Sequence, residues 1–390
     1  MCSFLKNLCS CSHPSSCLKH LPSKSQTEQV LERNATPQKL LPDSVIEDIL
    51  SRLPVRSLLR FGCVCKTWCS LLRDPWFITM HLKHSQAKRD CILLKGVTNI
   101  YLLDYGTCNH IEIEKLNYPS HLLKSGGSID VINLFSCNGL ICLSTDSNTL
   151  CLWNPSTGRQ KTLPQSVTRP NLWMYYTSLG FCYDPIADDY VVLKVYSSHG
   201  CPSVVEVYSL RKNSWMRIQN IPYHMCAKNK GTLFYGGSLH WVGNRSNCTI
   251  SFAPDIVIAF DIATKTFRDF RLPAYERLCE DWERGVVVGS PYFLVLDGCL
   301  CILRSHDQLN AAVWVMKECG VSESWIKLHT VELHGLALTV TKKREILLQR
   351  HSSITYLYAL KDKRIKPLIT QLTQEPFCFA TSFTESLVRL

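Results

Sequence analysis

Between Leu41 and Leu82 the apolar residues repeat at the spacing of an amphipathic helix. Ser44 and Glu47 have the spacing of a capping box, which predicts that a first helix begins here. Pro54 ends this helix because proline has no backbone donor. The apolar positions of the helix fall at i, i+1, i+4, i+5 and i+8, which places them on one face: Val45, Ile46, Ile49, Leu50 and Leu53.

A short second turn and a third helical segment follow, and Asp74-Pro75 ends the third. The apolar residues of these two parts are Leu58, Leu59, Phe61, Val64, Cys65, Trp68, Leu71 and Leu72. The pattern therefore predicts a unit of three short helices and about forty residues, a size at which a core alone rarely suffices. Either the rest of the chain or another protein must cover the remaining apolar side chains.

From Cys91 onward, short β-rich runs alternate with turn signals, and long helical patterns are absent from the sequence. Six units repeat, each with an apolar strand followed by a strand that carries a large anchor side chain. The anchors, spaced 44 to 55 residues apart, are Leu103, Trp153, Tyr208, Phe260, Trp314 and Tyr358. This period is typical of one four-stranded propeller blade. A two-sheet sandwich is the structural alternative.

The chain is therefore expected to be mainly β with a small N-terminal α unit. Residues 1–36 are polar and show no sustained periodicity, which predicts a disordered leader. The helical domain is expected at 37–84, and a six-bladed β-propeller at 91–390. We expect neither a transmembrane helix nor a secretory signal, because the sequence has no apolar run of the required length.

The net charge of +11 is spread along the chain, and its densest basic runs are Lys342–Arg344 and Lys361–Lys366. A nucleic-acid interface would concentrate these charges, so we expect no nucleic-acid partner and no membrane partner. The 21 cysteines lack framework or zinc-knuckle spacing. We interpret them mostly as free, buried thiols. Free thiols are typical of a reducing compartment, so the protein is expected in the cytoplasm and/or the nucleus. No metal and no cofactor is expected.

No motif in the sequence nominates a catalytic residue. The phosphate-binding loop, the zinc-protease helix and the nucleophile elbow are all absent from the sequence. His240, beside Trp241, falls in a predicted strand and is interpreted as a packed histidine. Asp184 and Asp188 fall where a turn is expected. The protein is accordingly expected not to be an enzyme.

The helical segment resembles an F-box. The matching residues are Leu41-Pro42, Ile49-Leu50, Leu53-Pro54-Val55, Leu58–Phe61, Cys63–Trp68, Asp74–Phe77 and His81-Leu82. This resemblance implies docking on the Skp-type adaptor of a cullin-based (SCF) ubiquitin ligase. The adaptor-binding residues that it implies are Leu41, Pro42, Ile46, Ile49, Leu50, Leu53, Pro54, Leu58, Leu59, Val64, Cys65 and Trp68. Some of these must instead hold the helices together, and the sequence does not separate the two groups.

The β-rich region resembles the F-box-associated, kelch-like β-propeller of plant F-box proteins. The residues that carry this resemblance are Asn138–Leu140, Trp153–Thr157, Gly180-Phe181, Tyr183–Pro185 and Leu239–Trp241. A looser kelch likeness lies in Val207-Tyr208 followed by Asn213–Trp215.

Together the two resemblances imply a non-catalytic substrate-recognition subunit of an SCF-type ubiquitin ligase. Its partners would be the Skp-type adaptor, through it a cullin ubiquitin ligase, and an unknown protein target. Target contacts are expected from loops at one propeller face: Pro164–Thr177, Ser197–Ser203 and Asn244–Pro254. Trp173, Tyr175 and Tyr176 are the candidate target-binding residues, because aromatic side chains are favoured hot spots. The alternative is that these rings pack against a blade.

Three alternative functions stay open at this point. The chain could be an F-box scaffold without a role in ubiquitination. It could be a propeller enzyme, which would need a cluster of carboxylates or histidines at the mouth of the central channel. It could also be a propeller that senses a ligand.

Overall fold

The computed structural model describes residues 41–88, 91–96, 98–105, 111–117, 119, 122, 131–145, 149–166, 176–198, 201–225, 232–245, 254–273, 291–305, 310–332, 336–341, 344–350, 354–367 and 377–390. The predicted leader, 1–36, lies outside these residues. The chain forms two compact units. The helical unit runs to Lys88 and includes Glu385–Leu387, and the propeller unit holds the residues between them together with Val388–Leu390.

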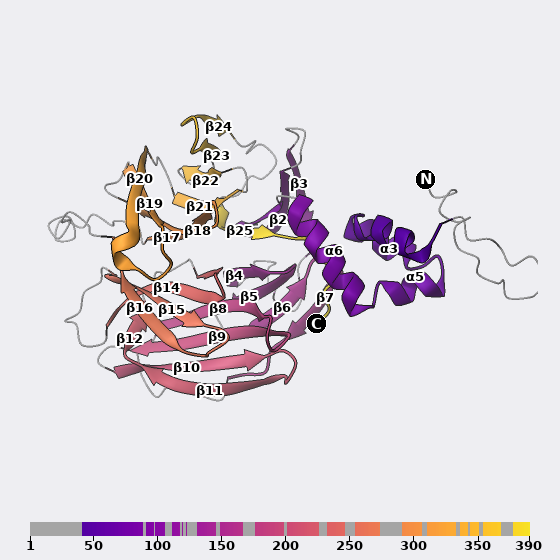
Figure 1. Cartoon of the computed structure of the whole chain (residues 1–390), viewed down its shortest axis with the longest axis horizontal. Helices are drawn as coiled ribbons and strands as arrows, with labels where there is room; N and C mark the ends of the chain where they lie inside the picture. The colour runs from indigo at the N-terminus through magenta and orange to yellow at the C-terminus, as the bar shows by residue number, and fades with distance from the viewer. Residues whose placement is uncertain are drawn as a thin grey trace, which may run out of the picture. The chain divides into compact units, whose positions relative to one another are not determined.

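The helical unit contains α3 (Asp43–Ser51), α4 (Val55–Phe61), α5 (Lys66–Leu71) and α6 (Pro75–Lys88) (Figure 1). The sequence predicted three helices. The fourth helix, α6, was missed because its polar and apolar residues are mixed around the helix. Its start is well defined, since the backbone N–H of Phe77 donates to Asp74 Oδ1 at 3.0 Å.

Proline residues, rather than the predicted capping box, start the first two helices. Pro42 and Pro54 are the N-cap residues of α3 and α4, with φ values of −58° and −59° and no side-chain cap. The backbone N–H groups of Val45 and Ile46 donate to the carbonyl of Pro42 at 3.1 and 3.2 Å. The two Leu-Pro pairs are therefore helix starts, because the proline ring fixes φ near the required value.

The propeller unit contains six antiparallel sheets, each of which is one blade. The strands are given from the inner to the outer edge. Blade 1 consists of β25 (Phe377–Phe383), β1 (Cys91–Gly96), β2 (Ile100–Tyr105) and β3 (Ile111–Leu116), and blade 2 consists of β4 (Val131–Cys137), β5 (Leu140–Thr145), β6 (Leu150–Asn154) and β7 (Arg159–Thr162). Blade 3 consists of β8 (Tyr176–Asp184), β9 (Asp189–Ser198), β10 (Cys201–Ser209) and β11 (Ser214–Ile221).

Blades 4 to 6 follow the same order, except that two short strands, β12 and β13, both pair with β14 in blade 4. Blade 4 consists of β12 (Tyr223–Met225), β13 (Leu233–Tyr235), β14 (Ser238–Arg245), β15 (Ile256–Asp261) and β16 (Phe267–Arg271). Blade 5 consists of β17 (Tyr292–Leu296), β18 (Cys299–Ser305), β19 (Asn310–Met316) and β20 (Trp325–Glu332). Blade 6 consists of β21 (Leu336–Val340), β22 (Glu345–Arg350), β23 (Ile354–Ala359) and β24 (Ile365–Pro367).

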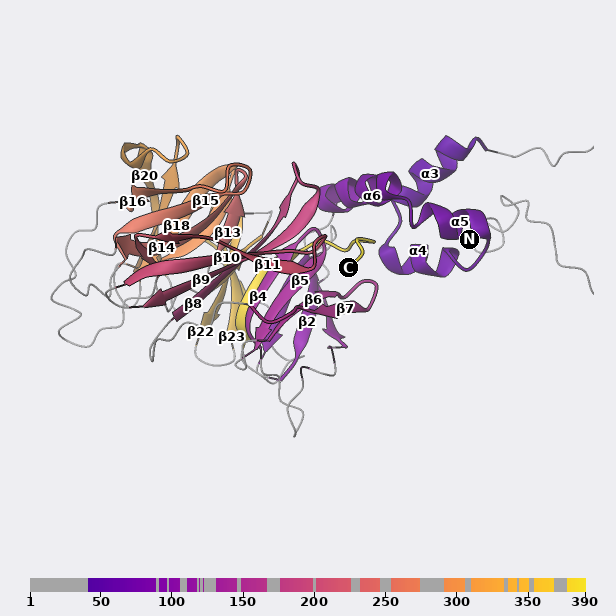
Figure 2. The ribbon, with the colours of Figure 1, turned by 90° about the horizontal axis from the view of Figure 1, so that it is seen from below.

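The inner strands pack in a closed ring. The strand β4 lies against β8, β8 against β13, β13 against β17, β17 against β21, β21 against β25, and β25 against β4. Figure 2 shows the blades fanning outward from these strands. The six-bladed propeller is thus confirmed, and the sandwich is excluded.

The last strand of the chain closes the ring. The strand β25 pairs antiparallel with β1, so that Phe383 lies opposite Cys91 and Phe379 opposite Lys95. The first blade is therefore built from both ends of the propeller sequence. No unit of the predicted repeat contained β25.

All six predicted anchor residues lie on the third strand of their blades: β2, β6, β10, β15, β19 and β23. Five are buried, and Trp314 on β19 is half-buried. The spacing of the repeat was readable because one large side chain fills the same position between neighbouring blades.

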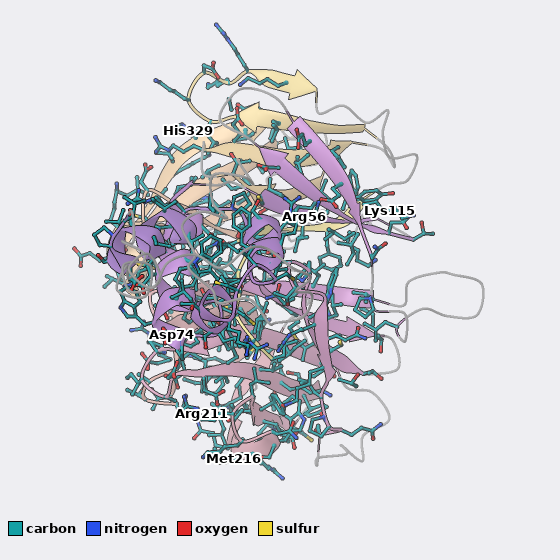
Figure 3. The ribbon with its side chains drawn as sticks, turned by 90° about the vertical axis from the view of Figure 1, so that its right-hand side faces the viewer. Arg56, Asp74, Lys115, Arg211, Met216 and His329 are labelled. Atoms are coloured by element: carbon teal, nitrogen blue, oxygen red, sulfur yellow. The ribbon has the colours of Figure 1, made fainter. Side chains whose placement is uncertain are left out.

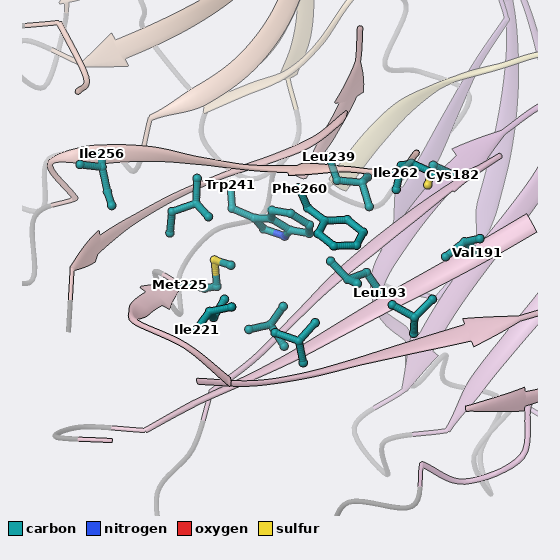
Figure 4. Close-up of a cluster of buried hydrophobic side chains, with 14 residues drawn as sticks. Cys182, Val191, Leu193, Ile221, Met225, Leu239, Trp241, Ile256, Phe260 and Ile262 are labelled. Atoms are coloured by element: carbon teal, nitrogen blue, oxygen red, sulfur yellow. The ribbon is translucent and has the colours of Figure 1, made fainter. Parts of the chain in front are cut away.

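A close approach joins blades 3 and 4 (Figure 4). A Cβ atom on Gly180 of β8 would lie 2.8 Å from Leu239 Cδ1 and 2.9 Å from Trp241 Cζ2. The Trp241 Nε1–H donates to the carbonyl of Leu179 at 3.3 Å. The Gly-Phe and Leu-His-Trp motifs are therefore two sides of one packing contact.

This contact predicts a coupled effect of two substitutions. Gly180→Ala adds a methyl group against Leu239 and should destabilise the propeller by about 1–3 kcal/mol. Leu239→Ala should cost about 2–5 kcal/mol because it leaves a cavity. Because the cavity makes room for the methyl group, the double variant should be more stable than the two separate losses imply. Chemical unfolding of the four proteins measures this coupling, and strict additivity would contradict the packing.

Candidate protein-docking surfaces

The helices of the helical unit share one hydrophobic core, here called the helical core. Its fully packed members are Ile46, Leu50, Val55, Leu58, Trp68, Leu72, Phe77 and Leu387. Seven come from the four helices and their junctions, and Leu387 comes from the end of the chain. The Cys65 thiol at the start of α5 accepts a hydrogen bond from the backbone of Trp68 at 3.5 Å. This hydrogen bond caps the start of α5, the helix that carries the core residue Trp68.

Other large apolar residues of the same unit face solvent. Val45 and Ile49 on α3 are 40% and 41% exposed, Leu59 on α4 is 41% exposed, and Val64 before α5 is 39% exposed. We call these four residues the exposed apolar set. Val45 and Ile49 share a helix face because they are four positions apart. Trp76 on α6 is also exposed.

The structure divides the twelve predicted adaptor-binding residues into groups. Members of the helical core are Ile46, Leu50, Leu58 and Trp68. Residues that are half-buried are Leu41, Leu53, Pro54 and Cys65. Residues that face solvent are Pro42, Ile49, Leu59 and Val64. Sequence reasoning named Val45 as part of an apolar face but did not nominate it, although its position one turn before Ile49 could have done so.

Polar side chains flank the exposed apolar set. On α3, Arg52 donates two hydrogen bonds to the carboxylate of Asp48, at 2.9 and 3.0 Å, and these contacts raise the pKa of Arg52. Arg56 on α4, labelled in Figure 3, lies three positions before Leu59 on the same helix. An apolar centre with a charged rim is the usual anatomy of a protein interface.

Polar contacts attach α6 to the other helices. The Nε2–H of the buried His81 donates to the carbonyl of Leu53 at 3.0 Å, and burial lowers the pKa of this histidine. The hydroxyl of Ser51, also buried, lies 2.8 Å from Nδ1 of His84. These contacts make α6 an integral part of the unit that presents the exposed apolar set.

The blades leave short turns at one end of the propeller. Several described connections between the first and second strands, or between the third and fourth, are short turns in which one residue has a positive φ, such as Asn138, Asp188 and Lys265. The chain also enters the propeller at Cys91 and leaves it at Phe383 at this end, because these two residues pair.

The predicted target-binding segments all connect strands at the opposite end. They join β7 to β8, β9 to β10, and β14 to β15. Tyr176 is the first residue of β8. Trp173 and Tyr175 lie outside the described residues, as do most residues of the three segments.

The acidic turn after β8 has a structural explanation. Asp184 Oδ1 accepts hydrogen bonds from the N–H groups of Ile186 and Ala187, and Asp184 Oδ2 lies 2.8 Å from Lys265 Nζ. Burial disfavours ionisation of Asp184, but these contacts outweigh it and lower the pKa. The carboxylate therefore caps the turn and joins blade 3 to Lys265 of blade 4.

The buried thiols are not activated. Burial raises the pKa of Cys137 and Cys301 to about 12 and that of Cys151 to about 11, and it raises the pKa of Cys142 and Cys182 still further. A thiolate nucleophile requires the opposite shift. Among the described residues, no group of three or more His, Cys, Asp or Glu side chains could hold a metal ion. No described helix is long and apolar enough to span a membrane.

Comparison with known families identifies both units. Residues 39–79 match the F-box domain, and residues 91–389 match the F-box associated beta propeller domain. The chain belongs to the F-box proteins with this propeller. The F-box protein CPR1 of Arabidopsis thaliana is 31% identical over 362 residues, which cover 84% of each chain.

Two other relatives come from the same plant. The putative F-box protein At3g16210 is 31% identical over 242 residues, covering 61% of this chain and 62% of that protein. The F-box/kelch-repeat protein At3g23880 is 29% identical over 304 residues, covering 75% and 79%. In this F-box protein, the exposed apolar set lies inside the F-box match, whereas Leu387 lies far beyond it.

His240 gives a pH prediction for the propeller of this F-box protein. Its ring is fully buried among the rings of Tyr235, Phe270 and Phe293, with centroids 6.3 to 6.5 Å away, and burial lowers its pKa to about 4. The unfolded histidine titrates near 6.5. Stability from this residue is therefore complete above pH 6.5 and is lost as the pH falls toward 4, by about 3 kcal/mol in all.

Urea unfolding at pH 7.0 and 4.5 of the wild type, His240→Leu and His329→Leu measures this effect. His329 lies on the outer strand β20 and serves as the control. The His240 variant should lose about 2–3 kcal/mol less between the two pH values than the wild type. Equal losses in all three proteins would contradict a neutral, buried His240.

Proposed function

We propose that this F-box protein is the substrate-recognition subunit of an SCF-type cullin ubiquitin ligase. Its F-box domain docks on a Skp-type adaptor, and its propeller binds a protein target. The chain supplies no catalytic residue of its own. It acts by raising the effective concentration of a target lysine near the activated ubiquitin carried by other subunits.

The observation that carries the docking half is the exposed apolar set. Each of its four side chains is about two-fifths exposed although the helical core is complete beside it. Covering the remaining surface would favour a complex by about 1 kcal/mol for each side chain. An apolar surface held by a rigid core, inside a matched F-box domain, is what a preformed docking site requires.

The two groups of residues have different proposed roles. Ile49, Leu59, Val64, Pro42 and, in addition, Val45 are proposed to contact the adaptor directly. Ile46, Leu50, Leu58 and Trp68 are proposed to act through the fold, since substituting them would open the helical core. Leu41, Leu53, Pro54 and Cys65, which are half-buried, border both groups.

For the target, we propose the propeller end opposite the short turns. Its support is topological, since the three candidate segments connect strands there, away from the entry and exit of the chain. Trp173, Tyr175 and Tyr176 are the proposed contact residues. Segments that join rigid strands can vary without unfolding the blades, so target choice can differ between relatives. Free thiols throughout the described part favour action in the cytoplasm or the nucleus.

An aspartate in the exposed apolar set should abolish docking without unfolding the domain. We expect Ile49→Asp and Leu59→Asp, in the full chain, to weaken adaptor binding at least a hundredfold, because each buries an unpaired charge in the interface. Each should lower the free energy of unfolding by only about 1–2 kcal/mol, less than a fully buried position would, since two-fifths of each side chain is exposed. Calorimetric titration with the purified adaptor and chemical unfolding measure the two effects.

Thr79→Asp is the matched control, because Thr79 lies on the exposed side of α6 and receives the same charge. It should bind the adaptor like the wild type. Wild-type affinity of Ile49→Asp and Leu59→Asp would rule out docking through this surface. Adding the cullin ligase then separates the functions: a receptor promotes ubiquitination of a captured target, whereas a scaffold binds the adaptor without it.

A further inference from the structure

A short segment that follows the last described propeller strand belongs to the helical unit. Glu385–Leu387 cluster with the F-box helices although they follow the last propeller strand. Leu387 is 4% exposed and is a full member of the helical core, and Ser386 beside it is completely buried. The F-box match ends at residue 79, and Glu385–Leu387 fall instead within the propeller match, 91–389.

This segment is short and held at both ends. Before it, Phe383 at the end of β25 pairs with Cys91. After it, the buried side-chain amide of Asn154 donates to the carbonyl of Val388 at 2.8 Å. Only four residues separate these attachments, so inserting Leu387 into a core orders little additional chain. The segment is therefore fixed on both sides, by the strand pairing of Phe383 and by the hydrogen bond to Val388.

We propose that Glu385–Leu387 complete the F-box domain, with Leu387 as a member of its core, so that only a chain that contains this segment docks on the adaptor. The docking consequence rests on the proposed function. A helical unit of this size has few residues with which to fill its core. Removing Leu387 would open a cavity among its partners.

The core also positions the docking surface. Ile46 of the core and Ile49 of the exposed apolar set lie on the same helix, and Leu58 and Leu59 are neighbours on α4. A loosened core therefore moves or frays the helices that carry the exposed side chains. A chain truncated before β25 lacks both the strand that closes the ring and Leu387 of the helical core. Such a chain could not bring an unfinished propeller to the ligase.

The experiment compares full-length wild type with Leu387→Asp, Leu387→Met and Arg389→Ala. Methionine keeps an apolar side chain of similar volume, and Arg389 is exposed two residues further on. Amide hydrogen exchange is followed in α3–α5 and, separately, in β14 and β15. Adaptor affinity is measured on the same samples.

In Leu387→Asp we expect amides of α3–α5 to exchange about tenfold faster or more, because the helices open locally. Adaptor affinity should fall by the same factor as the competent fraction, about tenfold where only about a tenth of the helical units stay closed. Strands β14 and β15 should keep their protection, and the other two variants should match the wild type.

Unchanged exchange in α3–α5 of Leu387→Asp would overturn the inference. Equal loss of protection in β14 and β15 would also overturn it, because Leu387 would then serve the propeller. If the wild type does not bind the adaptor, the proposed function fails, and the exchange comparison still decides whether the tail completes the helical unit.

Discussion

Phe383 near the end of the chain pairs with Cys91 at the start of the propeller, and the ladder between β25 and β1 closes the ring of six blades. Closure gives every inner strand a neighbour on both sides, so large side chains on the third strands are packed between blades. Because this ladder joins the two ends of the propeller sequence, closing it carries a loop-closure cost that local contacts must first offset. It is also a contact of high sequence separation, which slows folding.

The closed ring has two opposite faces, and different parts of the chain lie at each. The short turns and the chain entry lie at one end, and the connections proposed to contact a target lie at the other. The turns are fixed by local bonds, such as those that Asp184 accepts from the two residues after Pro185. A rigid frame of this kind allows target recognition to reside in segments that do not stabilise the fold.

Local and repeated features could be predicted from the sequence. The anchor spacing identified six blades because Trp153, Tyr208 and their equivalents repeat one packing position. The F-box pattern was readable because Pro54 and the apolar period mark the helices. Contacts between distant segments could not be read, and both β25 and Leu387 depend on partners about three hundred residues away.

The docking residues were predicted as a set but not sorted. Ile46 and Ile49 both fit the helical period, and so do the adjacent Leu58 and Leu59, yet one of each pair is buried and the other exposed. Spacing alone does not tell which side of a short helix with apolar residues on two faces meets the core. Similarly, Ser44 and Glu47 had capping-box spacing, but Pro42 had already set the start of α3.

The most direct test of the central claim is a hydrogen-exchange footprint of the full chain with and without a purified Skp-type adaptor. The account predicts that the adaptor slows exchange in α3, in α4 and in the segment around Val64, and leaves the propeller strands unchanged. No complex, or protection confined to the propeller, would contradict a docking role for the exposed apolar set.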